Sequence, residues 1–163
     1  MSSCIAKESV RETAVGMGQV AAGRAPQRMK AIVGSCVGVA LYHARLRVGA
    51  LAHVVLPESA GRAGAPGKFA DTALPHMLEL LERMGVPSQG LTAKLAGGAN
   101  MFDSTGPLRI GDANVEAVTR ELQRAGLRLV AQDVGGGKGR RLSFNCSDGM
   151  LTIENAGYPP KTL

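Results

Sequence analysis

Two neighbouring segments of the chain alternate apolar residues with small or polar ones, and a short link joins them. The segments cover residues 37–42 and 48–56, and the link covers 44–47. Alternation over several residues is typical of a β-strand, and strands joined by so few residues lie antiparallel. The pattern therefore predicts a β-hairpin, around which we expect the rest of the chain to be organised.

A turn centred between Arg45 and Leu46 fixes which residues share a face of this hairpin. In that register Gly38 lies directly opposite His53, and Cys36 is a diagonal neighbour of His53 on the same face. Diagonal neighbours have Cβ atoms roughly 5–8 Å apart, whereas a shift by one residue would place the two side chains on opposite faces. We interpret Gly38, which has no side chain, as leaving room for a substrate.

Cys36 and His53 are therefore candidates for a catalytic nucleophile and its base. A thiol within reach of an imidazole is the usual arrangement for nucleophilic catalysis by cysteine. Backbone N–H groups around Gly34 and Ser35 could stabilise an oxyanion, because glycine permits the tight backbone that such donors need. The alternative is a structural role, since cysteine is often buried as a small hydrophobe and a histidine within a strand can be a core residue.

Further elements follow from hydrophobic spacing. Apolar residues recur every three or four positions over 69–84 and 114–125, which predicts two helices; Pro75 marks either a true first turn or a kink. Residues 57–67, rich in Gly, Ala and Pro, are expected to form a mobile surface loop, either a connector or a lid. Shorter apolar runs predict strands at 13–22, 29–33, 91–95, 127–134, 140–146 and 150–155.

Strands and helices are mixed along the chain, with no internal repeat and no linker between domains. A chain of 163 residues is long enough to bury a core of its own. We therefore expect a single layered α/β domain over residues 13–157. A flexible tail at 1–12 is expected before it, and a C-terminal tail at 158–163 after it.

The formal net charge of +6 favours an acidic partner. We expect no nucleic acid, because the sequence has no zinc finger, no RNA-binding aromatic motif and no dense run of Lys and Arg. The glycine-rich run at 135–139 lacks the spacing of a phosphate-binding loop. It is expected to be a flexible loop that forms a basic patch with Arg140 and Arg141.

The three cysteines, Cys4, Cys36 and Cys146, are widely spaced and odd in number. They predict neither a zinc site nor a disulfide framework, and we expect no metal or cofactor. No apolar run has the length of a signal peptide or a membrane helix. The expected location is the cytoplasm, without membrane insertion, where thiols stay reduced.

Six short motifs, in order along the chain, resemble the chemoreceptor glutamine deamidase family (CheD). Several separate motifs in the same order make the resemblance specific, and it extends over nearly the whole chain. The motifs are GSCV at 34–37, LAHVVLP at 51–57, KFADTA at 68–73, GGANMF at 97–102, IGDANV at 110–115 and DVGG at 133–136.

The resemblance implies stacked mixed β-sheets with helices outside, as in cysteine deamidases of the cytotoxic necrotizing factor type. It implies conversion of receptor glutamines to glutamate and ammonia through a cysteine thioester, with Cys36 and His53 as catalytic residues. The loop with Gly98 and Asn100 is expected to lie near the substrate. The implied partners are the cytoplasmic helical bundle of a chemoreceptor and a phosphatase of the CheC type.

One position departs from the family. A catalytic threonine six places before the cysteine is replaced by Lys30. A charged lysine has no acceptor with which to orient a histidine, so we expect Lys30 to point to solvent. Another acceptor must then orient His53, and a backbone carbonyl, Ser35, Thr72 or Asn100 are the candidates.

Two other functions stay open. The chain could be a regulatory binding module for a CheC-type phosphatase, with little catalysis. It could also be a methylesterase that acts on glutamyl methyl esters at the same receptor sites. Release of ammonia from a receptor fragment separates the deamidase from the binding module, and release of methanol identifies the esterase.

Overall fold

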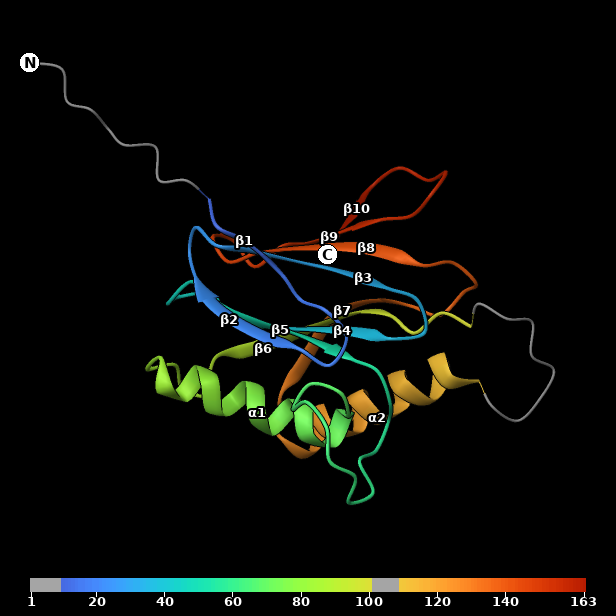
Figure 1. Ribbon diagram of the computed structural model, residues 1–163. Helices are drawn as coiled ribbons and strands as arrows, with labels where there is room; N and C mark the ends of the chain where they lie inside the picture. The colour runs from blue at the N-terminus through green and yellow to red at the C-terminus, as the bar shows by residue number, and fades with distance from the viewer. Residues whose placement is uncertain (1–9, 101–108) are drawn as a thin grey trace, which may run out of the picture.

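A computed structural model describes residues 10–100 and 109–163 of the chain (Figure 1). Within these residues two five-stranded β-sheets and two helices stack as three layers. Sheet A contains, in spatial order, β1 (Glu12–Ala14), β3 (Arg28–Val33), β8 (Arg140–Asn145), β9 (Leu151–Glu154) and β10 (Lys161–Thr162). Sheet B contains, in spatial order, β2 (Val20–Arg24), β5 (Val48–Val54), β4 (Val37–His43), β6 (Leu91–Gly97) and β7 (Arg128–Val134).

The helices α1 (Ala70–Arg83) and α2 (Ile110–Arg124) cover the face of sheet B that sheet A does not (Figure 1). Each sheet contains parallel and antiparallel pairs. The expectation of a layered α/β fold with mixed sheets and outer helices is confirmed. The helix α1 runs without interruption past Pro75.

Burial along the strands follows from this layering. Every residue of β4 and β5 is buried, whereas β3 alternates exposed and buried residues. A strand covered on both faces has no position where a polar side chain meets water, while a strand covered on one face alternates. Sheet B is therefore the inner layer and sheet A an outer one.

Two apolar cores result. Sheet B and the helices enclose the first, in which Leu41 packs with Met77 of α1 and Val118 of α2. The two sheets enclose the second, where the rings of Tyr42 and Phe144 meet edge to face with centroids 6.0 Å apart. Such contacts between the sheets fix how closely they approach one another.

The chain between residues 12 and 24 differs from expectation. Alternation over 13–22 predicts one strand, but the chain forms β1 in sheet A and β2 in sheet B. The residues between them, 15–19, cross from one sheet to the other. The two glycines in this segment imitate alternation, because small residues at every second position look like one face of a strand.

The last residues of the chain are also ordered by pairing. Lys161 and Thr162 pair with Ile153 and Thr152 of β9, and Leu163 exchanges two backbone hydrogen bonds with Leu151. Residues expected to form a tail thus include the edge strand of sheet A. Of the expected N-terminal tail, residues 1–9 lie outside the described part, and Glu12 begins β1.

We expect Gly49→Ala to destabilise the protein by overpacking the core between the sheets. A Cβ at Gly49 would lie 2.7 Å from the ring of Phe144 and 2.9 Å from the carbonyl oxygen of Leu41. Overpacking of this kind costs about 1–3 kcal/mol. Urea unfolding should show this loss, and Gly137→Ala, where the nearest atom is 3.8 Å away, is the matched control. Equal unfolding midpoints for the two variants would contradict the described packing.

Candidate active site

The hairpin of β4 and β5 has the register that the sequence predicts. Val37 pairs with Val54, and Gly38 pairs with His53. Cys36 directly precedes β4 and belongs to the apolar cluster between the two sheets. Because side chains alternate along a strand, Cys36 and His53 face sheet A from the same side of sheet B as diagonal neighbours.

The interpretation of Gly38 as room for a substrate is wrong. A Cβ on Gly38 would overlap Cδ1 of Leu142, which belongs to β8 of the opposite sheet. The space above Gly38 is therefore filled by protein. The glycine instead lets the two sheets pack closely beside His53.

The loop 34–36 carries the chain from sheet A to sheet B. Its first and last carbonyl groups accept hydrogen bonds from the N–H groups of Ala99 and Gly98, at 2.9 and 2.8 Å. The middle carbonyl, that of Ser35, accepts one from the side-chain amide of Asn114 at 3.0 Å. Buried carbonyl groups need such partners, and these three hold the loop in one conformation.

The loop beginning at Gly97 approaches Cys36 closely. Gly97 and Gly98 have φ angles of 118° and 65°, which residues other than glycine rarely adopt. A Cβ on Gly97 would overlap the carbonyl oxygen of Cys36. Gly97 is thus needed because its backbone lies directly on that of Cys36. A Cβ on Gly98 would instead meet Val115 and the carbonyl oxygen of Gly111 in α2.

Gly98 and Asn100, the expected substrate contacts, both make contacts within the protein. Gly98 donates its N–H to the loop of Cys36. The Asn100 side-chain amide donates to Asp112 at 2.9 Å, and its backbone N–H donates to the carbonyl of Gly136 at 2.8 Å. Contact of either residue with a substrate stays a prediction.

The imidazole of His53 is buried and oriented by a backbone carbonyl. Its Nδ1 lies 3.0 Å from the carbonyl oxygen of Val15, and a carbonyl can only accept a hydrogen bond. In the neutral imidazole Nδ1 therefore carries the proton, and Nε2 carries the lone pair. Nε2 has no hydrogen-bond partner within the described residues, so it is free to accept a proton.

The Lys30 side chain is exposed on β3, as expected, where it alternates with buried residues. Its ammonium group pairs with Glu12 at 3.0 Å, and both side chains are about half exposed. The backbone carbonyl of Lys30 accepts the N–H of Val15 at 2.7 Å. The backbone at position 30 thus supports His53 indirectly, through Val15.

Burial changes the acidity of both described thiols. It raises the pKa of Cys36, while the backbone N–H of Cys36 itself lowers that pKa. It raises the pKa of Cys146 to about 11. Cys36 is 8 % exposed and Cys146 is fully buried. Of the two, Cys36 is therefore the thiol better placed to react.

A cavity of about 650 Å³ opens on His53 at the edge of sheet A. It lies where β1 leaves β3, and its lining includes Lys30 and Arg141. Met17 and Ile32 line the same cavity and are 72 % and 71 % exposed, although both are large and apolar. The entrance is therefore apolar with two cationic side chains. Cys36 is not among its lining residues.

Two contacts close to the candidate site are not evident from the sequence. The role of the Val15 carbonyl cannot be predicted from the residue type, since every residue has a backbone carbonyl. Asn114 is buried on the face of α2 that also carries Val118 and Leu122. A polar residue on an otherwise apolar helical stripe is a signal that could have found it.

The prediction that Arg140 belongs to a basic patch at the glycine-rich loop is wrong. This side chain is buried, and it donates to the carbonyl groups of Gly97 and Gly135 at 3.1 and 2.8 Å. Its Nε lies 3.5 Å from a carboxylate oxygen of Asp133. Arg141 alone of the pair is exposed.

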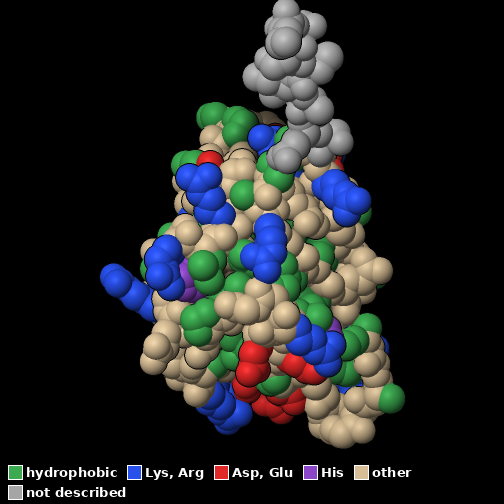
Figure 2. Space-filling model, turned by 90° about the vertical axis from the view of Figure 1, so that its left-hand side faces the viewer, with side chains coloured by type: hydrophobic (Ala, Val, Ile, Leu, Met, Phe, Trp, Pro, Cys, Tyr) green, Lys and Arg blue, Asp and Glu red, His purple; other side chains and the backbone are tan. Residues whose placement is uncertain are grey.

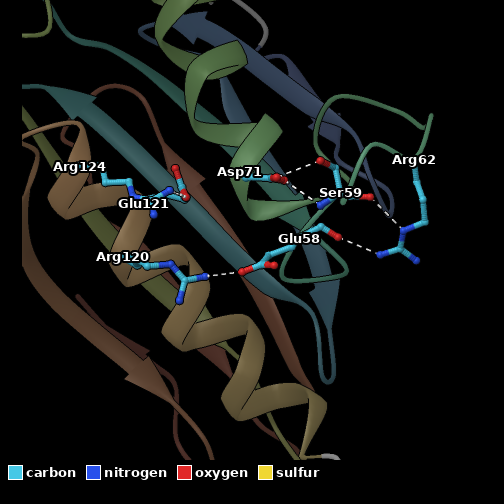
Figure 3. A network of polar contacts seen from close by, with 7 residues as sticks. All are labelled: Glu58, Ser59, Arg62, Asp71, Arg120, Glu121 and Arg124. Atoms are coloured by element: carbon cyan, nitrogen blue, oxygen red, sulfur yellow. Dashed lines mark hydrogen bonds and ion pairs between the residues drawn. The ribbon is translucent and has the colours of Figure 1, made fainter.

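The loop after β5 is fastened to both helices near its beginning (Figure 3). Asp71 of α1 accepts hydrogen bonds from the N–H and hydroxyl of Ser59 at 3.0 and 2.9 Å. Glu58 pairs with Arg120 of α2 at 3.0 Å. These contacts favour a connector over a lid for residues 57–67.

In residues 10–100 and 109–163 no three His, Cys, Asp or Glu side chains are grouped as a metal site would require. The helices of the same ranges are too short or too polar to cross a membrane.

A thiol and an imidazole on one covered face of a sheet, with a tightly held loop before the thiol, define a candidate cysteine-dependent hydrolase. A family model described as CheD chemotactic sensory transduction matches residues 55–155, more than half of the chain. On this match and on the relatives described next, the chain belongs to the CheD family, and the resemblance is confirmed.

Relatives match nearly the whole chain. The chemoreceptor glutamine deamidase CheD of Thermotoga maritima is 42 % identical over 144 residues, which are 88 % of this chain and 91 % of that protein. Probable chemoreceptor glutamine deamidases CheD of Desulforamulus reducens and Methanococcus maripaludis are 41 % and 40 % identical. They cover 93 % and 91 % of this chain, and 95 % and 97 % of their own lengths.

In a Cys4→Ser background, we expect iodoacetamide to alkylate Cys36 faster than Cys146 in the native protein. Thiolate is the reactive form, and Cys146 combines complete burial with a pKa of about 11. Because burial also raises the pKa of Cys36, its alkylation should keep accelerating into the alkaline range. Mass spectrometry after timed quenching measures both rates. Equal labelling, or faster labelling of Cys146, would count against Cys36 as the reactive thiol.

Proposed function

We propose that this chain hydrolyses glutamine side chains on chemoreceptors, giving glutamate and ammonia, with Cys36 as nucleophile and His53 as base. The observation that carries the proposal is the state of His53. Its Nδ1 is held by the Val15 carbonyl at 3.0 Å, its Nε2 is unpartnered among the described residues, and Cys36 is its diagonal neighbour. The names of the relatives, chemoreceptor glutamine deamidases, supply the substrate.

In the proposed reaction Nε2 of His53 takes the thiol proton, and the Cys36 sulfur attacks the carboxamide carbon. The carbon–nitrogen bond then breaks, and ammonia leaves with the proton that His53 returns. A thioester remains. Water, deprotonated by His53, attacks this thioester, releases glutamate and restores the thiol. Neither step requires a metal or a cofactor.

The hydrogen bonds that hold the loop 34–36 determine which backbone N–H groups are available to stabilise an oxyanion. Two of its carbonyl groups, those of Gly34 and Ser35, are bonded to Ala99 and Asn114. In a planar trans peptide the N–H points opposite to the C=O. The N–H groups of Ser35 and Cys36 therefore point away from these partners, which supports their use as an oxyanion hole.

The lining of the cavity at His53 supports the proposal that the substrate is a helix. Its apolar rim of Met17 and Ile32 suits the apolar stripe of an amphipathic helix, and Lys30 and Arg141 suit acidic neighbours of the target glutamine. Figure 2 shows Lys and Arg side chains scattered over the face that lies on the left in Figure 1, with a group of Asp and Glu side chains near its lower edge. We therefore propose that the net charge of +6 favours approach of an acidic partner generally.

The cytoplasm is the proposed location, because the cytoplasmic bundle of a chemoreceptor is the proposed substrate. Docking of a CheC-type phosphatase and kinship with deamidases of the cytotoxic necrotizing factor type remain predictions from the resemblance. The layered sheets with outer helices are compatible with that kinship. No observation favours the methylesterase, which release of methanol from a methylated receptor fragment would identify.

We expect Cys36→Ser and His53→Ala to abolish ammonia release from a receptor fragment. Loss of a nucleophile or its base should cost at least about 10³-fold in rate. His43→Ala is the matched control, because His43 is similarly buried but accepts the Leu46 N–H at the far end of the hairpin. Its rate should stay near that of the wild type. Retention of a tenth of the rate by Cys36→Ser would point to another nucleophile.

Lys30→Ala should leave kcat/KM for ammonia release within about threefold of the wild type. The lysine side chain makes a half-exposed ion pair, which contributes little, and its backbone carbonyl remains in place. Lys30→Thr is a second test of the same point. Its kcat/KM should not exceed that of the wild type by about tenfold. Such an increase would show that Val15 does not orient His53 sufficiently, and the binding-module alternative would then gain weight.

A further inference from the structure

Asn114 touches both segments that carry the proposed catalytic residues. It is fully buried in α2. Its Nδ2 donates one hydrogen bond to the carbonyl of Ser35 at 3.0 Å and another to the carbonyl of Val55 at 2.9 Å. Ser35 directly precedes Cys36, and Val55 follows His53 by two residues. One amide group thus joins the loop of the nucleophile to the strand of the base.

The bond to Ser35 also fixes the direction of a neighbouring donor. The carbonyl of Ser35 and the N–H of Cys36 belong to one planar peptide unit and point in opposite directions. While Asn114 holds the carbonyl, the Cys36 N–H must face the opposite side. That N–H interacts with the Cys36 thiol, where it lowers the pKa. The orientation of this donor is therefore coupled to Asn114.

The orientation of the Asn114 amide follows from its surroundings. Two carbonyl oxygens within 3.0 Å both require donors, and only the nitrogen of the amide supplies two. A rotated amide would set its oxygen against both carbonyl groups. A carboxylate or an alkyl group at this position would leave both carbonyl groups without their partner.

The part of α2 around Asn114 has little freedom to move. A Cβ on Gly111 would overlap the carbonyl oxygens of Gly98 and Ala99, so the helix lies directly on the loop that holds Cys36. Further along the helix, Arg120 pairs with Glu58, just beyond Val55 (Figure 3). The helix is thus a fixed support for both segments, and Asn114 is its contact with each of them.

We infer that Asn114 is a positioning residue, which sets the separation of Cys36 and His53 and aims the Cys36 N–H at the oxyanion. The inference rests on the proposed deamidase function. Asn114 does not touch the substrate; it acts through two backbone carbonyl groups. Its loss should therefore lower kcat and leave KM nearly unchanged, because the cavity that receives the substrate is lined by other residues.

The test compares Asn114→Ala, Asn114→Asp and Val118→Ala in a Cys4→Ser background. Asn114→Asp keeps the shape of the side chain but replaces the donor by an oxygen. Val118→Ala is the matched control, since Val118 is buried one turn further along α2 and belongs to the apolar core. For each variant the measurements are kcat and KM for ammonia release, the melting temperature, and the rate of Cys36 alkylation against pH.

We expect both Asn114 variants to lose about tenfold or more in kcat, with KM within about threefold. Their Cys36 alkylation should shift to higher pH, because the Cys36 N–H no longer lowers the thiol pKa. Relative to the wild type, Asn114→Asp should regain rate as the pH falls, since a protonated carboxyl donates one hydrogen bond. Val118→Ala should melt earlier but keep its kcat and its alkylation profile.

The inference is overturned if folded Asn114 variants keep kcat within about threefold, or if their losses match those of Val118→Ala at equal loss of melting temperature. If Asn114→Ala does not fold, Asn114→Asp and its recovery at low pH decide the matter. Wild-type protein that releases no ammonia would refute the proposed function instead. The alkylation profiles would then still test whether Asn114 controls the Cys36 thiol.

Discussion

The chain must pass from the outer sheet A to the inner sheet B without leaving polar backbone groups unpaired, and the candidate site lies where it does so. At residues 34–36 the strand ladder of β3 has ended and that of β4 has not begun. The carbonyl groups there are bonded instead to Gly98, Ala99 and Asn114. Leaving such groups unpaired would cost about 1–3 kcal/mol each. The same bonds that stabilise the crossing also hold the residue that carries the thiol.

Much of this arrangement can be read from the sequence, because it depends on side-chain size and alternation. The register that pairs Gly38 with His53 follows from the apolar pattern and the short link. The two glycines at the end of β6 signal a close backbone approach, and Cys36 is the partner that Gly97 approaches. Periodicity also predicts both helices, although α2 begins at Ile110, four residues earlier than expected.

What the sequence does not reveal depends on backbone atoms or on contacts between distant segments. The acceptor for His53 is a carbonyl of Val15, which any residue at that position would supply. Leu142 fills the space over Gly38 only because the two sheets stack, and no local pattern shows that contact. Arg140 looks like part of a basic loop until the fold brings Gly97, Gly135 and Asp133 around it.

The segment that orients His53 contacts both sheets, and the His53 imidazole is therefore oriented only in a chain in which both sheets have formed. Val15 is held by the carbonyl of Lys30 in sheet A, while its own carbonyl reaches a histidine of sheet B. The hairpin of β4 and β5 is local in sequence and can form early, whereas β1 and β3 pair in parallel and require the longer connection. A partly folded chain with sheet B alone would contain both Cys36 and His53, yet its imidazole would have no fixed tautomer. Orientation of the base therefore depends on both sheets being in place.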